Sequence, residues 1–225
     1  MKIISIITTI VITLSMLVAP HVQAMDYVAS TTPTKGNDAS IHPGEEITLS
    51  NGNSCTVGAV TQKGGMLHIL TAGHCGDEGD VIVAGGFTLR VVQSINNGIG
   101  KQDTLHAMGQ GVGTNTMPVT GGKIRVKGAS RPKVGQVVCS LGANSGWKCG
   151  KVTMVEGVSF ATDFCVYPGD SGSPVITEEG ALLGIVSAGI HAKSKTKKCK
   201  PNDGGFNTFV SHLGGSFPMG KTILL

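Results

Sequence analysis

Two short motifs carry side chains that together could cleave an acyl bond. His74 lies in the sequence TAGHC, directly after the apolar run Met66 to Leu70. Ser171 lies in GDSGSP, a turn whose glycines let main-chain N–H groups approach a ligand. A serine hydroxyl is a weak nucleophile at its free pKa, and an imidazole is the usual base that activates it. The two motifs therefore predict nucleophilic catalysis by Ser171 with His74 as the base.

An imidazole base also needs a carboxylate to hold its tautomer. The carboxylates between the two motifs are Asp77, Glu78, Asp80, Asp103, Glu156, Asp163 and Asp170. Three of them lie on the loop that follows His74, and Asp170 is the neighbour of Ser171. Residue types alone leave the choice among the seven open.

The elements that position these residues read as short strands. Runs rich in Val, Ile and Thr are interrupted every eight to twelve residues by Gly, Asn or Asp, which is typical of antiparallel all-β sandwiches and barrels. The one expected helical turn lies around Val210 to Leu213. The predicted strands are Thr56 to Thr61, Met66 to Thr71, Asp80 to Ala84, Phe87 to Val92, Lys123 to Lys127, Gln136 to Leu141, Lys151 to Val155, Pro174 to Thr177 and Ala181 to Ser187.

The chain divides into four segments by composition. Residues 1–24 have Lys2 near their start, followed by an apolar stretch. They end in Val22-Gln23-Ala24, which places small residues at positions −3 and −1 of a signal-peptidase site, so they predict a secretory signal. An uncleaved membrane anchor is the alternative, although five hydroxyl residues dilute the stretch. Residues 25–40 are polar and predict a short propeptide or flexible segment. The glycine-rich stretch Gly109 to Gly122 then separates an N-terminal half, 41–118, from a C-terminal half, 119–225.

Composition excludes several classes of protein. Charged residues make up only 14% of the 225 residues, where about a quarter is usual, and Gly contributes 34. These values argue against helical bundles, coiled coils and charge-driven disorder. The net charge of +4, one Trp and two Tyr do not indicate a nucleic-acid partner, and the basic run Lys193 to Lys200 stands alone. After signal cleavage we expect a secreted, extracellular chain with no stable membrane insertion.

Six cysteines follow the predicted signal, and an even number in an exported protein indicates disulfides. They are Cys55, Cys75, Cys139, Cys149, Cys165 and Cys199. No CxxC pair occurs, and the adjacent His74 and Cys75 alone come near zinc-site spacing, so we expect no metal. The sequence itself leaves the connectivity of the cysteines open.

The motifs resemble a known family. TAGHC and GDSGSP are similar to the His and Ser motifs of the chymotrypsin-like serine proteases, and GWKCG with CVYPGDSG resembles the bacterial streptogrisin and α-lytic branch. The resemblance implies two antiparallel six-stranded β-barrels with the active site in the cleft between them. It also implies a monomeric serine endopeptidase that acts on protein or peptide substrates through an acyl-enzyme intermediate, without a cofactor. The chain order His, Asp, Ser is that of this family.

The resemblance also assigns roles to individual residues. Asp103 matches the carboxylate of the triad, although Leu105 departs from the usual small residue and a capping or turn aspartate is the alternative. The N–H groups of Gly169 and Ser171 would form the oxyanion hole. Ser187, Ala188 and Gly189 would pair with the substrate backbone. Asp163 would favour Lys or Arg side chains from the base of the specificity pocket, whereas Phe164 beside it would make that wall apolar.

The implied disulfides are Cys55 to Cys75, Cys139 to Cys149 and Cys165 to Cys199. The resemblance leaves one structural question open, because relatives pair the Asp before the nucleophile either with a newly cut N-terminus or with an Arg. The stretch Cys139 to Gly142 has no Arg at that place, so the partner of Asp170 is not identified. Ile41 resembles a processed start, which would place a propeptide end at Ser40.

Two other functions compete with the protease. A chymotrypsin-like fold without activity would serve as a binding or adhesion protein, and the surroundings of Asp103 leave room for that. An esterase of the α/β-hydrolase type is disfavoured by the residue order, by Ser173 at the last position of the G-x-S-x-G elbow and by the lack of alternating strands and long helices.

Overall fold

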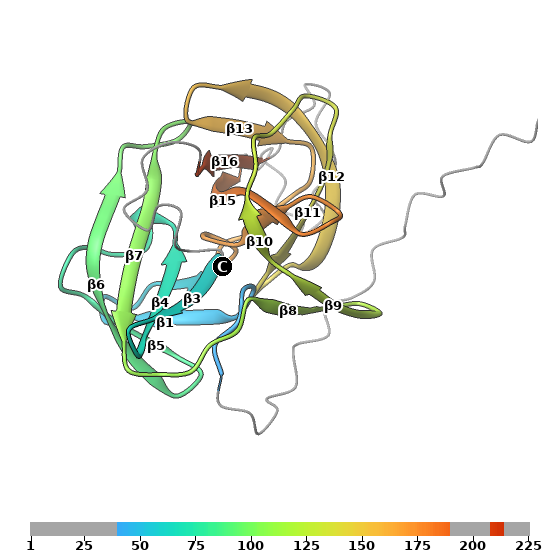
Figure 1. The fold of residues 1–225 in the computed structure, drawn as a ribbon. Coiled ribbons are helices and arrows are strands. Elements are labelled where there is room, and N and C mark those ends of the chain that lie inside the picture. The colour runs from blue at the N-terminus through green and yellow to red at the C-terminus, as the bar shows by residue number, and fades with distance from the viewer. Residues whose placement is uncertain (1–39, 190–207, 214–225) are drawn as a thin grey trace, which may run out of the picture.

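The computed structural model describes residues 40–189 and 208–213, and these form almost entirely β-structure (Figure 1). The predicted all-β, two-barrel fold is confirmed. The helical turn expected around Val210 to Leu213 is wrong, because Val210 to His212 belong to strand β16 (Thr208–His212). The buried residues of this strand pack in the second barrel, which outweighs the local preference. The predicted signal, residues 1–24, and the predicted propeptide, 25–40, lie outside the described residues except for Ser40, and so does Lys193 to Lys200.

Seven antiparallel strands make the first sheet, in the order β2-β1-β5-β6-β7-β4-β3. In chain order they are β1 (Glu46–Leu49), β2 (Ser54–Thr56), β3 (Ala59–Lys63), β4 (Met66–Thr71), β5 (Val81–Ala84), β6 (Phe87–Asn96) and β7 (Asp103–Gly109). Only Val57 and Gly58 separate the two edge strands β2 and β3. Val57 donates to the carbonyl of Glu45 and Gly58 to that of Leu70, so one bent segment bridges both edges of the sheet.

The second sheet closes on itself. Its order is β10-β15-β14-β11-β12-β13-β16, and β16 also pairs with β15. Besides β16, its strands are β10 (Lys127–Ala129), β11 (Val137–Gly142), β12 (Gly146–Glu156), β13 (Ser159–Thr162), β14 (Pro174–Ile176) and β15 (Ala181–Gly189). Strand β10 lies outside this ring and pairs parallel with β15. Strands β8 (Thr116–Val119) and β9 (Gly122–Arg125) form a separate ribbon.

Each sheet encloses its own core, and a third cluster joins them. Leu67, Ile69 and Leu105 are fully buried in the first core, and Phe160 and Leu183 in the second. The joining cluster contains Leu70 of β4 and Ile185 of β15, together with Ala59, Met117, Val126, Cys139, Ile176 and Leu182. Burying such apolar side chains is the main source of stability for a fold that contains little hydrogen-bonded helix. Figure 1 shows β1 to β7 gathered on one side and β11 to β16 on the other.

Gly58 marks the point where the two sheets touch. A Cβ atom at this position would lie 2.5 Å from the carbonyl oxygen of Gly172 and 2.6 Å from Ile185. Only a residue without a side chain allows the first sheet to approach the turn that carries Ser171 this closely. The described residues contain no helix with the length and apolar character of a membrane span.

Candidate active site

His74 lies in a single 3-10 turn, Gly73–Cys75, that begins where β4 ends. The turn packs tightly, since a Cβ on Gly73 would lie 2.0 Å from the carbonyl oxygen of Ile95. The hydroxyl of Ser94 donates to the carbonyls of Gly73 and Gly76, at 3.0 and 2.7 Å. These contacts fix the backbone that carries the imidazole. Sequence reasoning did not single out Ser94.

Asp103 opens β7, the strand that pairs with β4. Because Leu105 is the register partner of Thr71, Asp103 lies beside the turn that follows β4. Its Oδ1 accepts the backbone N–H of His74 at 2.8 Å, and its Oδ2 lies 2.7 Å from His74 Nδ1. The backbone N–H of Asp103 in turn donates to Ser211 Oγ at 3.1 Å. Strand pairing therefore brings this carboxylate, among the seven between the motifs, to the histidine.

The Asp103 carboxylate is almost fully buried, with 2% of the residue exposed. Burial raises the pKa of Asp103, but hydrogen bonds from the side chains of His74 and Ser187 outweigh it, so the pKa lies below its ordinary value. A carboxylate that stays ionised in a buried place can hold the Nδ1–H tautomer of His74, which leaves Nε2 free to accept a proton.

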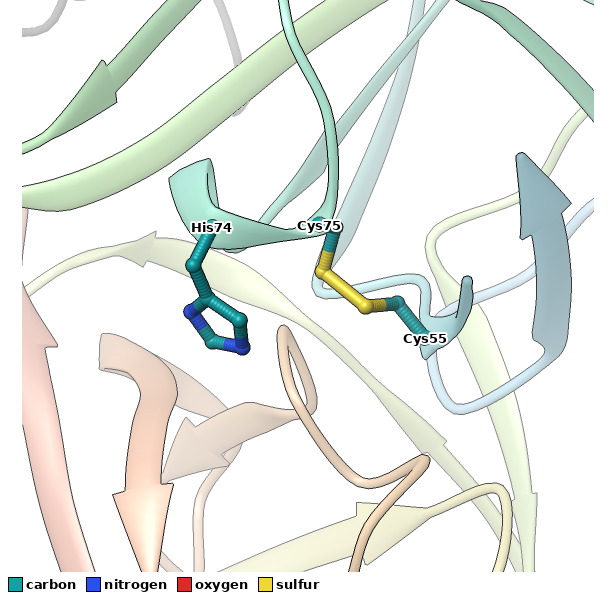
Figure 2. Close-up of side chains that lie close together, drawn as sticks. All are labelled: Cys55, His74 and Cys75. Atoms are coloured by element: carbon teal, nitrogen blue, oxygen red, sulfur yellow. A yellow bond between two sulfur atoms is a disulfide. The ribbon is translucent and has the colours of Figure 1, made fainter. Parts of the chain in front are cut away.

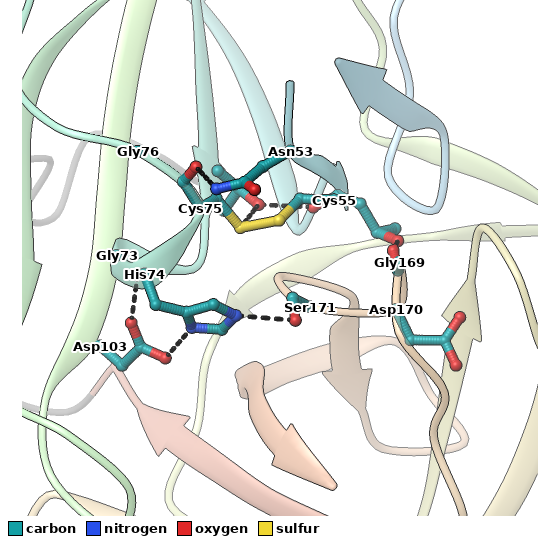
Figure 3. Close-up of a disulfide and its surroundings, with 12 residues drawn as sticks. Asn53, Cys55, Gly73, His74, Cys75, Gly76, Asp103, Gly169, Asp170 and Ser171 are labelled. Carbon is teal, nitrogen blue, oxygen red and sulfur yellow. Dashed lines mark hydrogen bonds and ion pairs between the residues drawn. A yellow bond between two sulfur atoms is a disulfide. The ribbon is translucent and has the colours of Figure 1, made fainter. Parts of the chain in front are cut away.

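Ser171 faces the other ring nitrogen. His74 Nε2 lies 2.8 Å from Ser171 Oγ, so the three side chains form a continuous hydrogen-bonded chain (Figure 3). Gly172 makes this approach possible, because its φ is +86° and a Cβ there would lie 2.0 Å from Thr71 Oγ1. An L-residue would have to adopt a strained backbone and would clash with the strand that leads to His74.

Two backbone N–H groups next to Ser171 Oγ have no partner within the described part of the chain: those of Gly169 and Ser171. Gly169 has a φ of +97°, which glycine adopts without strain. The carbonyls of the same two residues are held by Thr56, whose N–H donates to Ser171 O and whose hydroxyl donates to Gly169 O, both at 2.7 Å. Thr56 was predicted only as a strand residue, and nothing in the sequence pairs it with a turn more than a hundred residues away.

Comparison with known proteins agrees with this geometry. No family model matches the chain. It is 28% identical over 177 residues to streptogrisin-C of Streptomyces griseus, which covers 67% of this chain and 35% of the relative. The chain thus spans about a third of the length of that curated relative. Among solved structures it is similar to the Nocardiopsis protease NAPase, with 27% identity, a TM-score of 0.63 and coverage of 78% of this chain and 93% of that one.

A second solved structure agrees. Cellulomonas bogoriensis chymotrypsin has a TM-score of 0.62 at 25% identity, and the match covers 78% of this chain and 92% of that chain. The relatives share the fold, and the chain carries the family's His and Ser motifs at the facing ends of its two sheets. In fold and in its His and Ser motifs, the chain is similar to the bacterial chymotrypsin-like serine proteases.

In this chymotrypsin-like chain, the partner of Asp170 is Lys148, which sequence reasoning missed. Asp170 is fully buried, and its Oδ2 lies 3.6 Å from Lys148 Nζ. Lys148 Nζ also contacts Ser145 Oγ. Burial lowers the pKa of Lys148, whereas the nearby carboxylate of Asp170 acts to raise it. The lysine belongs to the GWKCG motif, but its position on β12 opposite Ser140 of β11 appears only once the strands are paired.

A cleft of about 370 Å³ opens beside the triad. His74, Asp103 and Ser171 line this cleft, together with Val166, Val186 and Gly189 among others. Ser187 and Ala188 also line it, as the resemblance implied for the segment that pairs with substrate. The Ser187 side chain has a second contact, because its hydroxyl donates to Asp103 Oδ2 at 2.5 Å.

Asp163 does not line this cleft. Its Oδ1 accepts the backbone N–H of Lys151 at 2.6 Å and lies against Gly150, where a Cβ would be only 2.2 Å away. The carboxylate therefore contacts the β12 backbone, and its expected role at the base of the specificity pocket stays a prediction. Phe164 is buried in the core of the second sheet and does not line the cleft either.

Two of the expected disulfides lie within the described residues. Cys55 pairs with Cys75, with an S–S distance of 2.00 Å, and Cys139 pairs with Cys149 at 2.01 Å. Cys165 is disulfide-bonded as well, and its expected partner Cys199 lies outside the described residues. The first disulfide ties β2, which carries Thr56, to the turn that carries His74.

The same cysteines explain the one possible metal-ligand group found among the described residues, Cys55, His74 and Cys75. Their ligand atoms lie within 4.8 Å of one another, but both sulfurs are used in the disulfide and offer no thiolate. Figure 2 shows the imidazole of His74 beside the disulfide, whose two sulfurs are bonded to each other. The expectation of no metal stays a prediction, and this cluster gives no reason to revise it.

Proposed function

We propose that the chain is a secreted serine endopeptidase in which Asp103, His74 and Ser171 act as the catalytic triad. The observation that carries the proposal is the hydrogen-bonded chain from the buried Asp103 carboxylate through both nitrogens of His74 to Ser171 Oγ. Exposed or core histidines do not normally bridge a buried carboxylate and a serine in a glycine-rich turn. The three disulfide-bonded regions support export to an oxidising compartment.

The proposed mechanism follows from where each group lies. Ser171 Oγ attacks a peptide carbonyl carbon while His74 Nε2 takes its proton, and ionised Asp103 stabilises the imidazolium that forms. The negative charge on the carbonyl oxygen is received by the N–H groups of Gly169 and Ser171, each worth about 3 kcal/mol of barrier in such a site. His74 then gives its proton to the leaving amine. Water repeats the cycle on the acyl-enzyme, so serine and histidine are both regenerated.

Thr56 keeps the oxyanion hole ready for use. By fixing the carbonyls on either side of Asp170, it leaves the neighbouring N–H groups aimed at the cleft. Donors that are already in place need no reorganisation when charge develops, which is why such preorganisation is effective. No metal or organic cofactor is required by this chemistry.

The substrate is proposed to be an extended peptide that adds to Ser187, Ala188 and Gly189 as a strand. Val166 and Val186 line the cleft close to Ser171, whereas the Asp163 carboxylate faces β12. We therefore expect cleavage after apolar residues in preference to Lys or Arg. A panel of peptides that differ only in the residue before the cleaved bond checks this, and faster cleavage after Arg than after Leu or Phe would contradict it.

The first experiment asks whether Ser171 is activated. The purified protein is treated with a phosphonylating serine-protease probe beside Ser171→Ala and His74→Ala, with Ser130→Ala as a control for an exposed hydroxyl. We expect one adduct by intact mass in the parent and in Ser130→Ala, and none in the other two. A folded, disulfide-bonded parent that takes no adduct would overturn the proposal and favour the inactive binding protein.

A further inference from the structure

Lys148 and Ser140 are direct partners across the β11–β12 pair, so both side chains lie on the same face of the sheet. Ser140 is fully buried, and its Oγ has no hydrogen-bond partner among the residues that the structure describes. Lys148 reaches from this face to Asp170 and Ser145, and 16% of its side chain is exposed. A buried cation is costly unless it is paired, which makes its position opposite a buried carboxylate informative.

We propose that Lys148 is a positioning residue that supplies the positive charge for Asp170 and thereby holds the Gly169–Ser171 turn in its reactive conformation, without help from a newly cut amino terminus. The inference rests on the proposed function, because the turn matters only if Ser171 and its N–H neighbours do chemistry. Lys148 belongs neither to the triad nor to the oxyanion hole, and its role is to position both.

Asp170 is held from several directions. Its Oδ1 accepts the N–H groups of Asn144 and Ser145, at 3.0 and 2.9 Å, and its Oδ2 accepts the N–H of Tyr167 at 2.8 Å. These dipoles stabilise the carboxylate, but they carry no net charge. Lys148 is the cation in contact with it among the described residues. The contact joins opposite charges in a region from which water is largely excluded, so water screens the attraction between them little.

The end of β11 packs closely against the carboxylate. A Cβ on Gly142 would lie 2.3 Å from Asp170 Oδ1, so the end of β11 presses against the carboxylate. The neighbouring Cys139–Cys149 disulfide ties β11 to β12 one residue before Ser140 and one after Lys148. The strand that carries the cation and the loop that covers the carboxylate are therefore one rigid unit.

A cut before Ile41 would not provide the charge. Ile41 is fully buried in the core of the first sheet, where its N–H donates to Val112 O at 2.9 Å and its carbonyl accepts from Thr114 N at 2.8 Å. Asp170, in contrast, is covered by residues 142–145 of the second sheet and by Lys148. Residue 41 is thus occupied elsewhere, and the ion pair is complete while Ser40 still precedes it.

The effect on catalysis follows from chain geometry. Asp170 stands between Gly169 and Ser171, so the two oxyanion donors move whenever its side chain moves. Without Lys148, the buried carboxylate would be left uncompensated, and turning it outward toward water would relieve that cost. Such a turn would misdirect both N–H groups, which in an oxyanion hole costs about 10² to 10³ in rate for each donor lost.

The experiment compares three variants of the full chain. Lys148→Met keeps the length and removes the charge, Lys148→Arg keeps the charge, and the exchange variant Ser140→Lys with Lys148→Ser moves the cation to the facing strand. We expect Lys148→Met to lose about 100-fold in kcat/KM and in the rate of phosphonate labelling. The Arg variant and the exchange variant should recover to within about tenfold of the parent, because charge rather than packing is what they restore.

Each result has a distinct meaning. An inactive parent would refute the proposed function itself. An active parent with Lys148→Met folded and within about threefold in kcat/KM would overturn the inference alone. If Lys148→Met does not fold, the double variant Lys148→Met with Asp170→Asn is compared with Asp170→Asn alone. An ion pair predicts that the double variant loses no more kcat/KM than Asp170→Asn does, and a greater loss in the double variant would overturn the inference.

The amino terminus is tested separately. A chain that begins at Ile41 and one with two extra residues, Gly-Ser, before Ile41 should have the same kcat/KM to within about twofold, because neither α-amino group reaches Asp170. A large loss on extension, with Lys148 intact, would show that the cut terminus provides the charge and would contradict the proposal.

Discussion

Strands β4 and β7 hold two histidine contacts of opposite chemistry. At one end His74 follows β4 and meets the Asp103 carboxylate of β7 at 2.7 Å. Within the same two strands, His68 of β4 meets His106 of β7, with 3.0 Å between Nδ1 and Nε2 and the rings stacked. Both contacts arise from the same strand pairing. The partner differs, and the partner decides what the imidazole can do.

A buried carboxylate favours a charged imidazole, whereas a second imidazole disfavours it. Burial, and then the nearby His68, lower the pKa of His106 from 6.5 to about 4, so this ring is neutral over most of the pH range. His74 has the opposite surroundings, because Asp103 stays ionised and accepts two of its hydrogen bonds. The first pair can pass a proton to and from Ser171, and the second pair only packs the outer face of the sheet.

The prediction with the largest expected effect makes the His74–Asp103 pair resemble the neutral His68–His106 pair. Asp103→Asn keeps the shape but offers an amide, which favours the wrong tautomer of His74. We expect kcat to fall by about 10⁴-fold, as in other triads of this type, with KM little changed. Steady-state kinetics on a short chromogenic peptide measures it. A loss below about tenfold would show that the carboxylate is a structural cap and not the third member of the triad.

A smaller effect on kcat is expected from substitution of Ser187, whose side chain and backbone have different contacts. Its hydroxyl donates to Asp103, while its backbone lines the cleft. Ser187→Ala removes a hydrogen bond to a charged group, worth about 1.5 kcal/mol or more, so we expect about a tenfold loss in kcat. KM should stay within about twofold because the backbone remains. A rise in KM with constant kcat would assign the side chain to substrate binding alone.

Which structural features could be predicted from the sequence depended on how far apart the contacting residues lie along the chain. Strand β4 was predicted with its observed bounds, and the two motifs placed His74 and Ser171 correctly at strand ends. Asp103 was found through the resemblance and not from residue types. Strands β1, β8 and β13 were not predicted, only the last residue of β2 was included in a predicted strand, and β16 was taken for helix.

Residues that act across the two sheets were not accessible in the same way. Thr56 holds Gly169 from 113 positions away, and Lys148 holds Asp170 from the strand that faces Ser140. No local pattern encodes such contacts, because they depend on register and on how the two sheets meet. The expected role of Asp163 in specificity comes from its position before Cys165 and stays a prediction, while its Oδ1 accepts the N–H of Lys151 on β12.

The smallest expected effect concerns the second histidine pair and leaves catalysis unchanged. The pKa of His106 is about 4 in the folded protein and 6.5 in the unfolded chain, so the unfolded chain binds more protons between these values. The stability that this group contributes is therefore fully present above about pH 6.5 and is lost as the pH falls toward 4. Acid should weaken the fold partly through His106.

His106→Gln tests this in the Ser171→Ala background, where self-cleavage cannot occur. Urea unfolding midpoints at pH 4.5, 5.5 and 7 should differ less than in Ser171→Ala alone, because glutamine cannot titrate, while activity of the single variant at neutral pH should match the parent. An unchanged slope of stability against pH would mean that protonated His106 is tolerated beside His68. The contrast between the two pairs would then rest on access to Ser171 rather than on charge, because an imidazole on the outer face could also carry a proton but has no serine nucleophile beside it from which to take one.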